Sequence, residues 1–183
     1  DYHNPTGVTM PLERRTALLD VARQYGILIV DDSPYRSVRF EGAPVTPLAA
    51  LDRDGIVIHL GTFAKLLAPG LRVGWAHAAP ALIARMAQLK TDAGSCPLTQ
   101  RIIVEFCARG RLADHTRLVQ ATYRDHRDRM VAAVRRELPD ASFTIPLGGY
   151  YLWLAFPAGV DGDVLARRAF DAGVTIIAGS RFF

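Results

Sequence analysis

Lysine is nearly absent from this 183-residue chain. Of its 22 lysine and arginine side chains, only Lys65 and Lys90 are lysines. An amine can lose its proton and attack a carbonyl carbon, whereas a guanidinium stays protonated at physiological pH. Lys65 stands between an apolar run and a Pro-Gly turn. This placement favours a chemical role, and the chemistry that it indicates is formation of a Schiff base.

Cysteine and long apolar runs are scarce as well. Cys96 and Cys107 do not form the pattern of a disulfide framework or a metal site, and the five histidines contain no pair at ligand spacing. We therefore expect no metal. No stretch is long and apolar enough to span a bilayer, and none reads as a signal peptide. We expect a cytoplasmic protein without a membrane partner.

Neither sign of charge dominates, because the formal net charge is only +4. The densest basic stretch covers residues 115–136 and includes His115, Arg124 and Arg127, but acidic residues interrupt and flank it. We interpret this stretch as a solvated or intersubunit helix face rather than a nucleic-acid surface. No nucleic-acid partner is expected for this segment.

Hydrophobic periodicity predicts an alternation of helices and strands. Helices are predicted over 11–25, 80–90, 98–138 with a break near 109–111, and 163–172, and strands over 27–30, 55–60, 72–77, 143–145, 150–156 and 174–177. The first two strands are continuous apolar runs, which are typical of a parallel sheet covered on both faces. The order predicts an α/β chain.

Three regions are predicted. Residues 1–110 would form part of a large domain, residues 111–138 a long interdomain helix, and residues 139–183 part of a small α+β domain. The chain opens on DYHNPTG, without Met and without the strand that should deliver this turn. We expect it to be part of a longer polypeptide.

Asp32 and Lys65 each follow the end of a predicted strand. In open α/β sheets the ligand crevice lies at the carboxyl ends of the strands, so both side chains are expected to face one pocket. Asp31, one residue earlier, should point to the other face of the sheet. Strand alternation should likewise divide Tyr150, Tyr151 and Trp153 between the substrate side and the core of the small domain, with Trp153 in the core.

Four motifs occur in order along the chain: NPTG at 4–7, DSPY at 32–35, GTFAKLLAPGLRVGW at 61–75 and PLGG at 146–149 ahead of Trp153. Together they resemble the fold-type I pyridoxal-phosphate enzymes, and most closely the class I/II aminotransferases. The match covers about the C-terminal half of such a protein. It implies part of a large domain with a three-layer, mostly parallel sheet, and part of a small α+β C-terminal domain.

The resemblance implies pyridoxal 5'-phosphate as cofactor. Six side chains are implied to bind it: Asn4, Asp32, Tyr35, Thr62, Lys65 and Arg72. Asp32 would hold the proton on the ring nitrogen, Asn4 and Tyr35 would donate to the phenolic oxygen, and Thr62 and Arg72 would bind the phosphate. Lys65, Asp32 and Tyr35 are the implied catalytic residues, with Lys65 as Schiff-base partner and proton-transferring base.

The implied activity is transfer of an amino group from an α-amino acid to a 2-oxo acid, through an aldimine on Lys65, in a homodimer. The same residues would also serve β-elimination, decarboxylation or oxidation of an amino acid, because fold and cofactor do not fix which bond breaks. A third possibility is the aminotransferase-like effector domain of a GntR-type transcription regulator.

The resemblance also implies an arginine that binds the substrate carboxylate. This arginine should come after Phe183, and Arg181 is interpreted as a loop residue. The substrate therefore stays open.

Overall fold

The computed structural model describes residues 1–92 and 94–182. The α-helices are α1 (Leu12–Tyr25), α2 (Leu48–Leu51), α3 (Pro80–Leu89), α4 (Pro97–Ala108), α5 (Arg111–Glu137) and α6 (Gly162–Asp171). The strands are β1 (Ile29–Asp32), β2 (Val57–Thr62) and β3 (Gly74–His77), and short 3-10 turns η1 and η2 cover Pro69–Leu71 and Gly179–Arg181. In the described part of the chain, no helix combines the length and the apolarity needed to cross a membrane.

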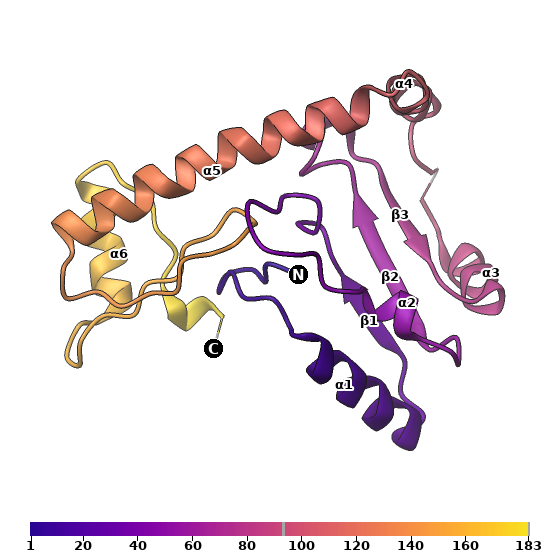
Figure 1. Ribbon diagram of the computed structural model, residues 1–183, viewed down its shortest axis with the longest axis horizontal. Coiled ribbons are helices and arrows are strands. Elements are labelled where there is room, and N and C mark those ends of the chain that lie inside the picture. Colours follow the sequence, from indigo (N-terminus) through magenta and orange to yellow (C-terminus); the bar gives the residue numbers. More distant parts are fainter. Residues whose placement is uncertain (93, 183) are drawn as a thin grey trace.

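The three strands form one mixed sheet in the order β1-β2-β3 (Figure 1). β1 and β2 are parallel, as expected for the two continuous apolar runs, and Asp32 lies opposite Leu60. The expected cover on both faces is wrong for the first run, because Val30 of β1 is 60 % exposed. β3 runs antiparallel to β2, with Thr62 opposite Gly74. The chain reverses through η1, and a hydrogen bond from the Phe63 N–H to the Val73 carbonyl at 3.1 Å closes this connection.

Helix α1 packs on the sheet through an apolar cluster that it shares with α2. Leu19 of α1, Leu48 of α2 and Val57 of β2 are buried together. The helix ends at Gly26, whose left-handed backbone (φ 63°) lets its N–H bond back to the last turn. Gly26 thereby directs the chain into β1, and the carboxyl end of β1 carries Asp31 and Asp32.

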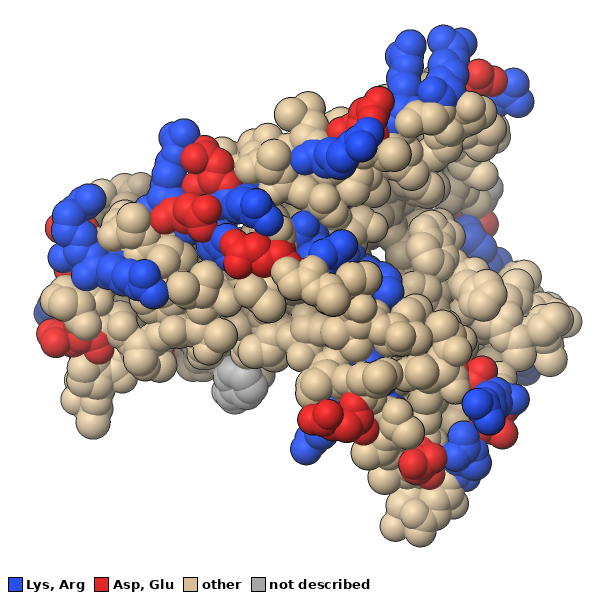
Figure 2. Space-filling view, in the orientation of Figure 1, with Lys and Arg blue, Asp and Glu red and all other residues tan. Residues whose placement is uncertain are grey.

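Helix α5, with 27 residues, is the longest element, and it runs from the side of the molecule that holds the sheet to the side that holds α6 (Figure 1). It begins at Arg111 and ends at Glu137, close to the expected limits of 111–138. Charged groups of both signs lie along its outer face (Figure 2). The division of the chain into three regions stays a prediction.

The inner face of α5 departs from the expected solvated surface. Arg127 is 9 % exposed and donates to the carbonyl of Pro146 at 2.7 Å, and it also bonds to Glu41. Arg124 donates to the carbonyl of Phe40. These side chains are held on the inner face because loop carbonyls supply acceptors for their N–H groups. The prediction of a solvated or intersubunit face was therefore wrong for Arg127.

The last third contains fewer strands than predicted. Within the described residues, segments 143–145, 150–156 and 174–177 form no strand, and pairing is limited to the isolated bridges Ser142–Ala155 and Arg39–Gly148. A ladder requires a neighbouring extended segment in register, and among the described residues only Ala155 of these three runs is paired, in a single bridge. Their composition is strand-like, but the predicted strands were wrong.

Candidate functional site

Lys65 lies in a tight turn that directly follows β2. The turn is closed by a hydrogen bond from the Leu67 N–H to the Phe63 carbonyl at 2.8 Å. The hydroxyl of Thr62 accepts from the Ala64 N–H at 3.0 Å and donates to the Val73 carbonyl at 3.2 Å. The end of β2, the turn and the return towards β3 are thus tied together, and Lys65 is held at the carboxyl end of β2.

Tyr35 provides the surface beneath the lysine. The Lys65 Nζ lies 5.7 Å from the centre of the Tyr35 ring, and Tyr35 is 5 % exposed. The hydroxyls of Tyr35 and Tyr151 are 3.2 Å apart. Burial, followed by the hydrogen bond with Tyr151, raises the pKa of Tyr35. The phenol therefore stays protonated at neutral pH and can act as a donor.

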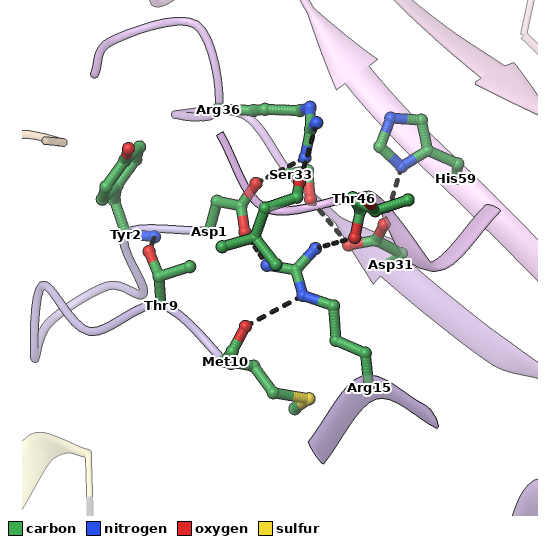
Figure 3. Close-up of polar contacts among 11 residues, drawn as sticks. Asp1, Tyr2, Thr9, Met10, Arg15, Asp31, Ser33, Arg36, Thr46 and His59 are labelled. Carbon is green, nitrogen blue, oxygen red and sulfur yellow. Dashed lines mark hydrogen bonds and ion pairs between the residues drawn. The ribbon is translucent and has the colours of Figure 1, made fainter. Parts of the chain in front are cut away.

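Asp31 and Asp32 have different surroundings, as strand alternation predicts. Asp31 accepts a hydrogen bond from the Ser33 hydroxyl at 2.6 Å and lies 2.8 Å from Nδ1 of His59 (Figure 3). Burial works to raise the pKa of Asp31, but the hydrogen bonds from Ser33 and His59 outweigh it and leave that pKa below its ordinary value. Asp32 is exposed, and its charge contributes to raising the pKa of Tyr35. Within residues 1–92 and 94–182, the Asp32 carboxylate makes no hydrogen bond or ion pair, and it lies on the side of Tyr35.

A buried ionic cluster lies next to Asp31, and no pattern in the sequence indicates it (Figure 3). Asp1 pairs with both Arg15 and Arg36, and its side chain is 5 % exposed. Arg15 of α1 also donates to the carbonyls of Met10 at 2.9 Å and Thr46 at 3.0 Å. Arg15 occupies an ordinary position in an amphipathic helix, so its sequence context does not distinguish it. The cluster ties the segment that carries Asn4 to α1 and to the loop after β1.

Asn4 and Arg72, the first and the last of the predicted site residues, are both exposed. Asn4 is exposed in a turn in which the His3 N–H bonds to the Val8 carbonyl at 2.9 Å. Arg72 is exposed and donates to the carbonyl of Pro69 at 3.0 Å. Among the described residues, neither makes a hydrogen bond to Lys65 or Asp32. Lys65 and Tyr35 come together, and Asp32 lies close enough to Tyr35 to act on its pKa, while the roles of all six predicted site residues stay predictions.

The donor set at these strand ends fits pyridoxal phosphate. It offers one amine, one free carboxylate, one protonated phenol and a nearby hydroxyl, on Lys65, Asp32, Tyr35 and Thr62. A separate cavity of about 390 Å³ lies along α5 and is lined mostly by apolar groups, including Val131. Lys65 and Asp32 do not line that cavity. We therefore place the candidate site at the strand ends, on the basis of its chemistry.

Comparison with known proteins gives consistent similarities. The family model described as aminotransferase class I and II matches residues 2–182. Aromatic-amino-acid aminotransferase 1 of Thermococcus litoralis is 39% identical over all of this chain and 44% of its own length. The crystal structure of LysN, the α-aminoadipate aminotransferase of Thermus thermophilus, complexed with N-(5'-phosphopyridoxyl)-L-leucine, has a TM-score of 0.92 and 34% identity, over all of this chain and 48% of that one.

A relative of another kind is also similar. An uncharacterized HTH-type transcriptional regulator of Bacillus subtilis, YdfD, is 31% identical over 98% of this chain and 38% of its own length. The chain spans less than half the length of each of these relatives.

Proposed function

This chain belongs to the class I and II aminotransferase family, and we propose that the protein that contains it transfers an amino group from an α-amino acid to a 2-oxo acid. The observation that carries the proposal is the position of the Lys65 amine, 5.7 Å from the ring centre of a buried tyrosine, at the end of β2. When bound, pyridoxal phosphate supplies the electron sink for chemistry at the substrate Cα. The family relationship gives the cofactor, and the residue roles below are part of the proposal.

In this proposal each side chain has one task. Lys65 would hold the cofactor through Nζ and, as a free amine, would move a proton at the substrate Cα. Asp32 holds a proton on the ring nitrogen, which requires a carboxylate that no neighbouring group has already neutralised. Tyr35 and Asn4 would donate hydrogen bonds to the phenolic oxygen, and the raised pKa of Tyr35 keeps its hydroxyl protonated over a wider pH range. Thr62 and Arg72 bind the phosphate through a hydroxyl and a two-pronged cation.

The test compares the two lysines of the chain in the full-length protein. Lys65→Ala is expected to lose both the visible absorption of the bound cofactor and turnover, because Nζ makes the covalent bond and carries the proton. Lys90→Ala is the matched control, since Lys90 is exposed and pairs with the exposed Asp92. Turnover retained by Lys65→Ala would refute the assignment.

The outcome of the reaction is tested separately. We expect that mixing the full-length protein with a panel of amino acids converts the bound cofactor to its amine form without uptake of oxygen. Oxygen uptake or ammonia release would indicate oxidation or elimination instead, and carbon dioxide release would indicate decarboxylation. Aromatic amino acids and 2-aminoadipate belong in the panel because relatives named for them match the whole chain.

We also propose that the full-length protein is a homodimer and that it is located in the cytoplasm. Sedimentation would check the dimer, and cell fractionation would check the location.

The similarity to a transcription regulator favours a second candidate function. In that case these residues would form an effector-sensing domain that binds pyridoxal phosphate and an amino acid. Specific DNA binding by the full-length protein that changes when an amino acid is added would support this function. Multiple turnover with a 2-oxo acid acceptor would support the enzyme.

A further inference from the structure

The backbone carbonyl of Lys65 has no local hydrogen-bond donor. In a continued helix it would accept from the N–H four residues later, but that residue is Pro69, which has none. The turn makes a backbone bond from Leu67 to Phe63 and then ends. Lys65 is half-buried, and a carbonyl without a partner costs free energy, so its donor has to come from a distant part of the chain or from water.

Two distant side chains supply donors at this turn. The hydroxyl of Tyr150 donates to the Lys65 carbonyl. Nε2 of His115, on α5, lies 2.9 Å from the carbonyl of Leu66, and because a carbonyl only accepts, the imidazole donates. Successive carbonyls of the reactive turn are therefore bound from α5 and from the segment that follows it.

Both donors are held in place by aromatic contacts. The Tyr150 ring stacks on Tyr123 of α5 at 4.5 Å and meets the Tyr35 ring edge-on at 5.4 Å. The Tyr150 hydroxyl is a donor because the Lys65 carbonyl can only accept, and burial, followed by a hydrogen bond with Tyr123, raises the pKa of Tyr150. His115 meets Phe106 of α4 edge-on at 5.8 Å. Rings packed in this way lose little freedom on making their hydrogen bonds.

We propose that Tyr150 and His115 are positioning residues: by holding the carbonyls of Lys65 and Leu66, they fix the turn so that the Lys65 amine stays over Tyr35. Tyr150 contacts Tyr35 as well, so it sets the amine and the ring beneath it relative to each other. The structural part of this proposal stands on the contacts alone. Its catalytic consequence rests on the proposed function.

The first test measures amide hydrogen exchange in the full-length protein without cofactor. Tyr150→Phe keeps the ring and removes the hydroxyl. In this variant the amide hydrogens of the peptide that contains Leu67 are expected to exchange about fivefold faster, because one hydrogen bond that holds the turn is lost. Tyr151→Phe is the matched control, because its hydroxyl pairs with Tyr35 rather than with the turn. It should leave exchange at Leu67 unchanged.

A second pair of variants tests the other donor. His115→Leu removes the N–H and is expected to accelerate exchange of the same peptide by about fivefold. His115→Gln keeps an N–H donor and should stay within about twofold of the wild type. The proposal is overturned if Tyr150→Phe and His115→Leu both exchange like the wild type. It is also overturned if peptides throughout the chain accelerate equally, because that reports global destabilisation.

Kinetics of the full-length holoenzyme test the catalytic consequence. Tyr150→Phe is expected to lower kcat by about tenfold with little change in KM, because a displaced lysine affects proton transfer more than substrate binding. An unchanged kcat in an active protein would overturn the positioning role. If the wild type has no transaminase activity, the proposed function fails, and exchange at Leu67 alone then decides whether Tyr150 and His115 fix the turn.

Discussion

Asp31 and Asp32 are neighbours in β1, yet their carboxylates have different partners. Asp31 is bound by Ser33 and His59 and its side chain is 11 % exposed, whereas Asp32 is exposed and acts on Tyr35 through its charge. Adjacent residues of a strand face opposite sides, so one carboxylate joins the packing between strands while the other is left for a ligand. We propose that Asp31 has a structural role and Asp32 a chemical one, and single substitutions can test this division.

Replacing each aspartate by asparagine should give opposite phenotypes. Asp32→Asn is expected to lower kcat about 10- to 100-fold, because a charge-assisted hydrogen bond contributes about 1.5–3 kcal/mol, and to leave stability nearly unchanged. Asp31→Asn should cost about 1–3 kcal/mol in the free energy of unfolding through weaker bonds to Ser33 and His59. Steady-state kinetics and urea unfolding of the full-length protein would measure both. Equal effects of the two variants on kcat would contradict the division of roles.

The pH dependence of stability follows from the lowered pKa of Asp31. A carboxyl whose pKa is lower in the folded state stabilises the protein above its unfolded value of about 3.9, and that stability is lost as the pH falls through the folded value. The wild type should therefore be more stable than Asp31→Asn at pH 6. The difference should shrink below about pH 4. Unfolding curves at several pH values would show it, and a constant difference would disprove the linkage.

Gly61 of β2 leaves room for the indole of Trp75 on β3. A Cβ atom added at Gly61 would clash with three atoms of the Trp75 indole, and the most distant of the three would lie 2.9 Å from it. Gly61→Ala is expected to lower the free energy of unfolding by about 1–3 kcal/mol, as for other overpacked sites. Gly70→Ala is the control, because no described atom lies within 4 Å of the place that its Cβ would take. Adding Trp75→Ala to Gly61→Ala should remove part of the cost, and failure of this rescue would argue against the clash.

Local sequence patterns predicted the strands and turns around the site, because each of these patterns occupies only a few neighbouring residues. The apolar runs before Asp32 and Thr62 gave the parallel pair β1 and β2, and alternation correctly separated Asp31 from Asp32. Pro69 and Gly70 predicted the turn after Lys65, although the pattern did not specify the antiparallel return of β3. Each strand and the turn depend on residues less than a dozen positions apart, whereas the pairing of β1 with β2 joins residues 28 positions apart, such as Ile29 and Val57.

Contacts between distant segments could not be predicted in the same way. Tyr150 reaches the carbonyl of Lys65 across 85 positions, and His115 reaches Leu66 across 49. Nothing in the composition of α5 distinguishes His115 from its solvated neighbours, because its acceptor is a backbone carbonyl. The predicted strands 150–156 and 174–177 failed for the same reason, since a strand needs a partner that its own sequence does not specify.

Arg127 is the buried cation that joins α5 to two loops, and its replacement should be the costliest on that helix. Its side chain is 7 % exposed, bonds to Pro146, Glu41 and Asp128, and lies 5.5 Å from the Phe40 ring centre. Arg127→Met keeps the length but leaves the Pro146 carbonyl unpaired, which should lower the free energy of unfolding by about 2–4 kcal/mol. Arg129→Met is the control, because Arg129 is 77% exposed and pairs with the exposed Asp125, so the expected change is below about 1 kcal/mol. Chemical denaturation of both full-length variants would measure the difference in the free energy of unfolding. Equal losses in the two variants would show that the buried Arg127 stabilises the protein no more than the exposed Arg129 does.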